Sequence, residues 1–184
     1  MLILASASPR RQQLLLEAGI AHTVEVRPTE EVWPEHLPAG AVARFLAEQK
    51  ARAWQPEDLL DGRTILTADT TVVLGDRILN KPADVAEARA MLQDLSGRAH
   101  QVITGVALYS ARGMESFAEV TEVEFRPLSE GEIEAYIATG SPFDKAGAYG
   151  IQDGFGMTAV TGIRGDYYNV VGLPVARVWE RLNR

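Results

Sequence analysis

A short apolar run leads directly into a segment typical of a helix start, and this junction constrains the fold more than any other feature. Leu2-Ile3-Leu4 is followed by Ser6-Ala7-Ser8-Pro9-Arg10-Arg11 and then by a Leu-rich stretch. Ser8 suits the N-cap, where its hydroxyl can accept from a free backbone N–H, and Pro9 suits the first helical position. The pattern predicts a buried strand that feeds a helix ending at Gly19, a typical C′ residue.

The same junction is suited to anions. Unpaired amides and the positive end of the helix dipole favour a negative charge at a helix start. Arg10 and Arg11 add forked donors that match phosphate oxygens. Strand-to-helix junctions commonly carry these start signals, however, and paired arginines are usually solvated. Taken alone, the junction leaves phosphate binding and a purely structural interpretation open.

Composition narrows the class of protein. The 184 residues with 46% hydrophobic content fit one domain spanning residues 1–184. The net charge of -7 argues against a broad nucleic-acid surface, and the absence of cysteine excludes disulfides and thiolate chemistry. The apolar runs are too short for a membrane span or a secretory signal. We therefore expect a soluble cytoplasmic protein with neither nucleic acid nor membrane as a partner.

An acidic loop precedes the second predicted helix. Residues 28–40 contain three prolines together with Glu30 and Glu31, which is typical of a loop that carries ligands. Residues 41–54 follow with helical spacing of their apolar positions, and Lys50 lies at the border of the buried face. Lys50 can therefore reach an interior cleft, although a lysine that snorkels to solvent is the alternative.

An acid interrupts an apolar strand in the middle of the chain. Residues 64–74 read as a strand that contains Asp69, and a two-residue turn at 75–76 returns the chain as a hairpin. A buried carboxylate must be paired, hydrogen-bonded or bound to a metal. A turn-capping role and a metal or catalytic role both suit Asp69, and Thr70 and Thr71 fit either one.

After the hairpin, the chain adds helices with capping signals and further strands. Lys81 lies on the loop before a helix whose Asp84 and Glu87 form a capping box, and Ser129 and Glu132 form another. We expect strands at 100–109, 115–125 and 157–163. A terminal helix starts at Pro174, and its apolar positions, Val175, Val178, Trp179 and Leu182, are expected in the core.

The loop 141–152 combines glycine, opposite charges and an amide. Long irregular loops in compact domains are usually functional or disordered, and the aromatic and apolar residues here favour order. The amide of Gln152 presents one acceptor and a pair of donors, which match the O4 and N3–H edge of uracil or thymine. Because the amide can flip, Gln152 alone does not exclude cytosine.

Several fragments together resemble the Maf family of nucleotide pyrophosphatases over nearly the whole chain. They are Ser6-Ala7-Ser8-Pro9-Arg10-Arg11, Ala68-Asp69-Thr70, Lys81-Pro82, Leu95-Ser96-Gly97-Arg98, Asp144-Lys145-Ala146-Gly147-Ala148-Tyr149-Gly150-Ile151-Gln152 and Gly165-Asp166-Tyr167-Tyr168. The segment 144–152 is similar to the dTTP/UTP branch rather than the branch acting on 7-methyl-GTP. The resemblance implies an α/β fold with an elongated mixed sheet flanked by helices, like that of inosine-triphosphate pyrophosphatases.

The resemblance also implies residue roles. It makes Asp69 the proton acceptor and a metal ligand, and it assigns substrate choice to Arg10, Thr70 and Gln152. The implied phosphate and metal site is lined by Ser6, Arg10, Arg11, Glu31, Lys50 and Lys81. The adjacent Glu30 leaves open which glutamate lines the site.

The implied reaction is the metal-dependent hydrolysis of dTTP and UTP, or of modified pyrimidine triphosphates, to the monophosphate and pyrophosphate. The expected cofactor is a divalent cation, Mg²⁺ or Mn²⁺, and the expected partner is the nucleoside triphosphate. The alternative is a regulator of septum formation that binds nucleotide without significant turnover. A homodimer is the alternative for the oligomeric state, because the helical spacing that places Trp179 in the core suits an interface equally well.

Overall fold

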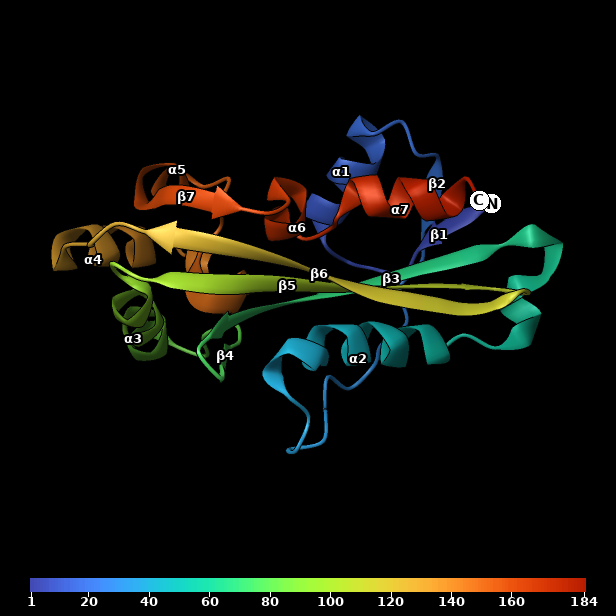
Figure 1. Cartoon of the computed structure of the whole chain (residues 1–184), viewed down its shortest axis with the longest axis horizontal. Helices are drawn as coiled ribbons and strands as arrows, with labels where there is room; N and C mark the ends of the chain where they lie inside the picture. The colour runs from blue at the N-terminus through green and yellow to red at the C-terminus, as the bar shows by residue number, and fades with distance from the viewer. The chain divides into compact units, whose positions relative to one another are not determined.

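The protein is an α/β structure, seen here in a computed structural model (Figure 1) that describes residues 1–60 and 62–184 and the backbone of residue 61. Within the described chain, the strands are β1 (Leu2–Leu4), β2 (His22–Val24), β3 (Thr64–Leu74), β4 (Arg77–Leu79), β5 (Ala99–Ser110), β6 (Gly113–Phe125) and β7 (Val160–Arg164). Their order in the sheet is β2-β1-β3-β5-β6-β7, and β4 pairs with β3. Parallel β1–β2 and β1–β3 pairs occur with antiparallel β3–β4 and β6–β7 pairs, so the predicted mixed sheet is confirmed.

Helices connect and flank these strands. They are α1 (Pro9–Glu17), α2 (Ala39–Arg52), α3 (Val85–Leu95), α4 (Glu130–Ala138), α5 (Gly154–Ala159), α6 (Tyr167–Val171) and α7 (Val175–Leu182), with 3₁₀ turns η1 (Pro56–Gly62), η2 (Ser141–Asp144) and η3 (Ala146–Ala148). The chain divides into two compact units, the first formed by 1–70, 104–119 and 172–184 and the second by 71–103 and 120–171. The expectation of one domain stays a prediction. Within the described residues, no helix is long and apolar enough to cross a bilayer.

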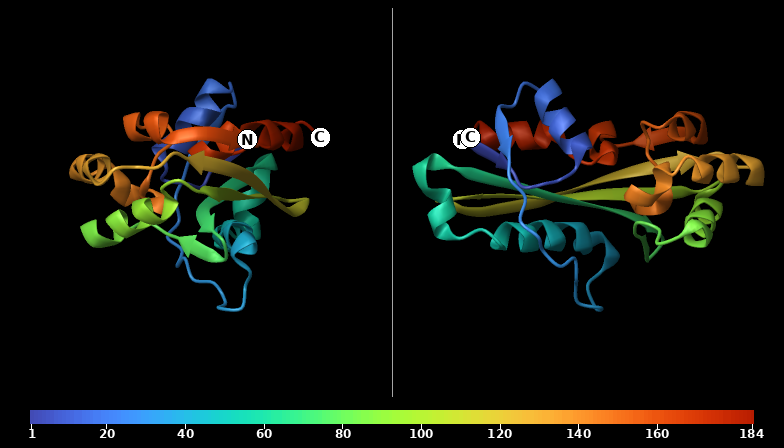
Figure 2. Two further views of the ribbon diagram at one scale, coloured as in Figure 1. Left: turned by 60° about the vertical axis from the view of Figure 1, so that its left-hand side comes forward. Right: turned by 180° about the vertical axis from the view of Figure 1, so that it is seen from behind.

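The first unit is built around β1. Ile3 of this buried strand lies opposite Thr23 of β2 and Ile65 of β3. Helices α1 and α7 cover one face of these strands and α2 covers the other, as the front and rear views both show (Figures 1 and 2). Ile3 and Ile65 pack with Trp54 and Leu59 in a buried cluster. This core holds β1 and the start of β3 in place, and the candidate site is built from the loop after β1 and from the residues farther along β3.

The junction after β1 forms largely as predicted. Pro9 is the first residue of α1, and Gly19 follows its end with a φ of +68°, a conformation that glycine adopts without strain. One detail of the prediction is wrong. Ser8 occupies the N-cap but makes no side-chain capping bond. Its backbone N–H instead donates to Ser6 Oγ at 3.2 Å, so the serine two residues earlier orders the loop.

The second unit confirms both capping predictions in outline. Asp84 caps α3 by accepting from the Glu87 N–H at 2.8 Å, although the Glu87 carboxylate accepts from Ala83 rather than Asp84. Ser129 and Glu132 form a complete capping box at the start of α4. Each of these helices therefore begins where the sequence predicts.

Two expectations for the last third of the chain are wrong. Residues 157–159 belong to α5 rather than to a strand, and β7 begins at Val160. A Cβ on Gly156 of α5 would lie 2.2 Å from the Gly150 carbonyl oxygen, so this helical turn depends on close backbone packing that strand propensity does not reveal. In α7, Val178 is buried as expected, but Trp179 is 51% exposed.

We expect His100 to make the stability of the fold depend on pH. The ring is buried against Phe125 and Tyr149, and Nε2 hydrogen-bonds to the Tyr149 hydroxyl at 2.8 Å. Burial lowers the pKa of His100 to about 4. Above an unfolded pKa of about 6.5 neither state is protonated, whereas between pH 6.5 and 4 the unfolded chain alone binds a proton. We expect His100 to account for a loss of about 3 kcal/mol of unfolding free energy over that interval.

Urea unfolding at pH 7 and pH 4 measures this loss. Other groups also titrate in acid, so the matched variant is His100→Gln, which lacks the titrating ring. The variant should lose less stability than the unsubstituted protein over the same interval. Equal losses in the two proteins would show that His100 does not drive the acid sensitivity.

Candidate active site

Asp69 is a largely buried acid on β3. Its side chain is 11% exposed, and Oδ1 accepts a hydrogen bond from Lys50 Nζ at 2.6 Å. The sequence predicts that a carboxylate in this apolar strand needs a partner, and the structure confirms this requirement. Charge-assisted hydrogen bonds of this kind are short and strong, so the pair holds the carboxylate in a defined orientation.

Lys50 lies between two carboxylates. It belongs to α2, one turn after the buried Leu46, and of the two orientations that the sequence leaves open its ammonium takes the inward one. Lys50 Nζ lies 2.6 Å from Asp69 Oδ1 and 2.8 Å from Glu31 Oε1. These three side chains, which we call the Asp69 cluster, carry a formal net charge of −1, which favours a further cation.

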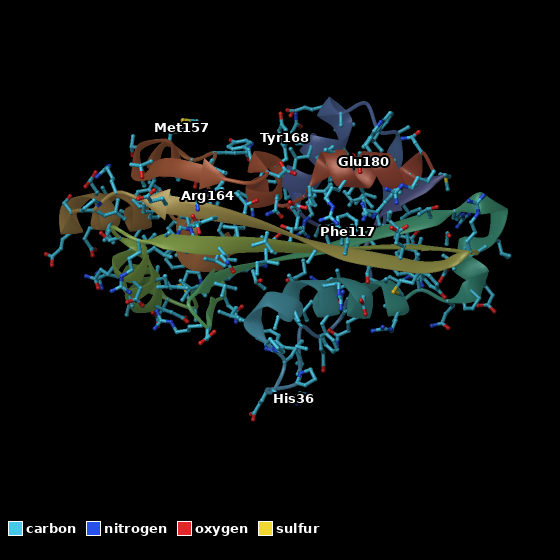
Figure 3. All side chains as sticks on the ribbon, in the orientation of Figure 1. His36, Phe117, Met157, Arg164, Tyr168 and Glu180 are labelled. Carbon is cyan, nitrogen blue, oxygen red and sulfur yellow. The ribbon has the colours of Figure 1, made fainter. Side chains whose placement is uncertain are left out.

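Glu31 comes from the irregular segment between β2 and α2. Figure 3 shows His36 at the outer end of this segment, projecting away from α2. The Glu31 carboxylate is half exposed but reaches Lys50 from this segment. Of the two adjacent glutamates that the sequence leaves open, the structure brings Glu31 to the Asp69 cluster.

Arg11 is a hydrogen-bonding centre at the start of α1. It donates through Nε to Gly172 O (2.8 Å), through Nη1 to Ala68 O (2.8 Å) and Ser6 Oγ (3.2 Å), and through Nη2 to Thr70 Oγ1 (3.1 Å). Two of these acceptors flank Asp69 in β3. Burial lowers the pKa of Arg11, and the negative charge of Asp69 opposes that shift. Arg11 thus orders the strand around Asp69, while its expected contact with phosphate stays a prediction.

Thr70 is held from two sides. Its hydroxyl accepts from Arg11 and forms a 2.8 Å hydrogen bond with the Thr104 hydroxyl. Sequence reasoning missed Thr104, which is fully buried in β5. A threonine within the apolar stretch 102–108 was the available signal, because a buried hydroxyl needs a hydrogen-bonding partner.

The other predicted residues of the first unit lie beside Arg11. Ser6 is buried in the loop between β1 and α1, and its Oγ accepts from Arg11 and from the Ser8 N–H. Arg10 is half-buried in the first turn of α1, where its positive charge contributes to the lowered pKa of Arg11. Ser6 and Arg10 therefore lie beside Arg11, while their expected contacts with phosphate stay predictions.

Lys81 and Gln152 belong to the second unit. Lys81 is exposed on the loop between β4 and α3, directly after Asn80, whose carbonyl accepts from the Gly147 N–H at 3.2 Å. Gln152 is exposed in the turn before α5. Their expected roles in phosphate binding and base choice stay predictions.

The Asp69 cluster fits a divalent metal whose remaining ligands are waters and the phosphates of a substrate. In the part of the chain described here, no group of three His, Asp or Glu side chains forms a ready-made metal site. Asp69 and Glu31 nevertheless share the Lys50 ammonium as a common partner, so two hard oxygen donors are close together. Mg²⁺ is typically held by one or two carboxylates, waters and substrate phosphates, and this donor set is compatible with such binding.

The family model and the sequence relatives below match this chain over all or nearly all of its length. The Maf family model, described as Maf-like protein, matches residues 1–184. A dTTP/UTP pyrophosphatase of Halalkalibacterium halodurans is 52% identical, with 98% of this chain and 94% of that protein covered. A dTTP/UTP pyrophosphatase of Moorella thermoacetica is 50% identical, with 98% and 93% covered.

A solved structure, that of the Staphylococcus aureus Ham1 protein, aligns with a TM-score of 0.48 at 13% identity, covering 67% of this chain and 71% of that one. The resemblance read from the sequence fragments is confirmed by the family match and by the relatives. The chain belongs to the Maf family.

Proposed function

We propose that this protein is a hydrolase that converts dTTP and UTP to the monophosphate and pyrophosphate. The observation that supports this most is the Asp69 cluster, a largely buried acid paired with Lys50 beside Glu31, in a member of the Maf family. Relatives at 50% and 52% identity carry the name dTTP/UTP pyrophosphatase. The cluster supplies the groups that hydrolysis of a phosphoanhydride needs: a proton acceptor and fixed positive charge.

Asp69 accepts the proton of the attacking water in this proposal. Lys50 engages Oδ1, so the other carboxylate oxygen, Oδ2, is the acceptor that remains for the water. Arg11 holds Ala68 O and Thr70 Oγ1 on either side of Asp69, and this limits how far the carboxylate can turn. A base fixed in this way contributes through its orientation as well as its basicity.

Positive charge stabilises the pyrophosphate that leaves. Lys50 and Arg10 supply it from the first unit, and we assign Lys81 of the second unit to the same task. Ser6 and the amides at the start of α1 add hydrogen-bond donors of the kind that bind phosphate. Catalysis of phosphoryl transfer rests mainly on such positioned charges.

Asp69 and Glu31 are the residues that would hold Mg²⁺ or Mn²⁺. When bound, the ion supplies positive charge to phosphate oxygens and polarises water. The net negative charge of the Asp69 cluster otherwise disfavours a polyanion, so the metal and the nucleotide are expected to bind together.

Base choice is assigned to Gln152, Thr70 and Arg10. The Gln152 amide carries the acceptor and donors that match the O4 and N3–H edge of uracil and thymine. Thr70 has its hydroxyl oriented by Arg11 and Thr104, so its position is fixed before substrate binds. Modified pyrimidine triphosphates that keep this edge are expected to be substrates as well.

A panel of nucleoside triphosphates, assayed with Mg²⁺ and with Mn²⁺, tests the proposal. We expect pyrophosphate from UTP and dTTP at rates well above those for ATP, GTP and CTP, and loss of activity with a chelator. Release of orthophosphate would contradict the proposed bond cleavage. Nucleotide-dependent thermal stabilisation without turnover would instead favour a regulator that binds nucleotide.

A further inference from the structure

We infer that Tyr136 and Asp153 are positioning residues that fix how Gln152 is presented to the base of the nucleotide. This inference rests on the proposed function and deepens it. Neither side chain is assigned to the reaction by the sequence motifs. Both lie in the second unit, where they form a hydrogen-bonded anchor around the turn that carries Gln152.

A single phenol holds the chain on both sides of Gln152. The Tyr136 hydroxyl donates to Asp153 Oδ2 at 2.6 Å and accepts from the Gly150 N–H at 3.2 Å. Between these two anchored residues, Ile151 is buried and Gln152 is exposed. The buried neighbour and the two hydrogen bonds leave Gln152 as the outward-facing member of the turn.

Tyr136 is itself rigidly placed. It belongs to α4, whose start is fixed by the Ser129–Glu132 capping box. Its ring stacks on Phe155 with centroids 4.2 Å apart and planes 4° from parallel. Burial and the hydrogen bond to Asp153 raise the pKa of Tyr136, so the phenol keeps its proton and remains a donor near neutral pH.

Asp153 joins this anchor to the preceding loop. Its Oδ2 also accepts from the Ser141 hydroxyl at 2.7 Å and lies 3.7 Å from Lys145 Nζ. Lys145 Nζ in turn donates to the Ser141 carbonyl at 2.7 Å. Ser141 and Lys145 of the preceding loop therefore both lie against the Asp153 carboxylate.

Gly150 leaves room for the side chains of Lys145 and Asp153 to approach the turn. A Cβ at this position would come within 2.7 Å of Lys145 Cε and 2.9 Å of the Asp153 carboxylate. The side chains of Lys145 and Asp153 therefore occupy the space that a Cβ at Gly150 would need. Such packing, together with the Asp153 hydrogen bonds, gives a side chain on an exposed turn the fixed direction that base recognition requires.

The test is Tyr136→Phe, which removes the hydroxyl and keeps the ring stack. We expect the preference for UTP over ATP and GTP, measured as the ratio of kcat/KM values, to fall about tenfold. The change should appear mainly as a higher KM for UTP, because contacts to the base are present before and during the reaction. An unchanged preference would overturn the inference.

Tyr149→Phe is the matched control. It also removes a buried hydroxyl, the one bonded to His100, but it leaves the Tyr136–Asp153 anchor in place. We expect it to lower stability without changing the preference for UTP. A similar loss of preference in this variant would show that any loosening of the aromatic packing alters base choice, and it would overturn the specific role of Tyr136.

A double variant separates positioning of Gln152 from other effects. Gln152→Ala alone should blur base choice, and adding Tyr136→Phe should then reduce the preference no further, because both changes act through one side chain. Additive losses would overturn the inference while leaving the proposed function intact. If the unsubstituted protein releases pyrophosphate from no nucleoside triphosphate, the proposed function itself fails, and the inference fails with it.

Discussion

Asp69→Asn is expected to lower the turnover of UTP by about a hundredfold or more while the protein still folds. Asparagine has nearly the same shape, and its side-chain oxygen can keep the hydrogen bond from Lys50 that Asp69 Oδ1 accepts at 2.6 Å. An amide does not act as a base at neutral pH, so the attacking water loses its proton acceptor. Steady-state release of pyrophosphate measures the loss.

Asp76→Asn is the control for this change. Asp76 is exposed in the turn between β3 and β4, and the substitution removes the same charge at a place with no proposed role. Its turnover should equal that of the unsubstituted protein. Urea unfolding of Asp69→Asn should remain cooperative, which separates a lost base from a lost fold. An Asp69→Asn protein that keeps most of its activity would remove Asp69 from its proposed role.

Gly105→Ala is expected to lower the unfolding free energy by about 3 kcal/mol or more. Gly105 lies in β5 directly against the backbone of α2, and a Cβ there would come within 2.2 Å of the Ala43 carbonyl carbon and oxygen. Backbone atoms cannot turn aside as a side chain can, so α2 as a whole must shift. Urea or thermal unfolding measures the cost.

The same shift should reduce turnover, since α2 carries Lys50. The matched control is Gly131→Ala in α4, where a Cβ meets no atom within 4 Å. That variant should be as stable as the unsubstituted protein or more so by about 0.5–1 kcal/mol, because alanine favours a helix. Equal stability of the Gly105 and Gly131 variants would contradict the close approach of α2 to β5.

Local signals made part of this structure predictable. Pro9 and Gly19 delimit α1, and Ser129 delimits α4, because caps act over a few residues of chain. Asp69 could be recognised from its apolar surroundings as an acid in need of a partner. Lys50 could be recognised as able to supply one, since helical spacing places it at the edge of a buried face.

Other features depend on contacts that no local pattern contains. Arg11 has the charge and shape of a phosphate ligand, and only the fold reveals that its donors point to Gly172 O, Ala68 O and side-chain hydroxyls. Strand propensity at 157–159 is overridden by the close packing of Gly156. Trp179 follows the apolar spacing of α7 but lies half exposed at the edge of the buried stripe.

Hydrolysis of UTP in water enriched in oxygen-18 tests the central claim, that water activated at Asp69 displaces pyrophosphate as one unit. Mass spectrometry of the products locates the new oxygen. The account predicts UMP carrying one heavy oxygen and pyrophosphate carrying none, because water then attacks the phosphorus next to the sugar. Label in the pyrophosphate, or orthophosphate as the product, would contradict it.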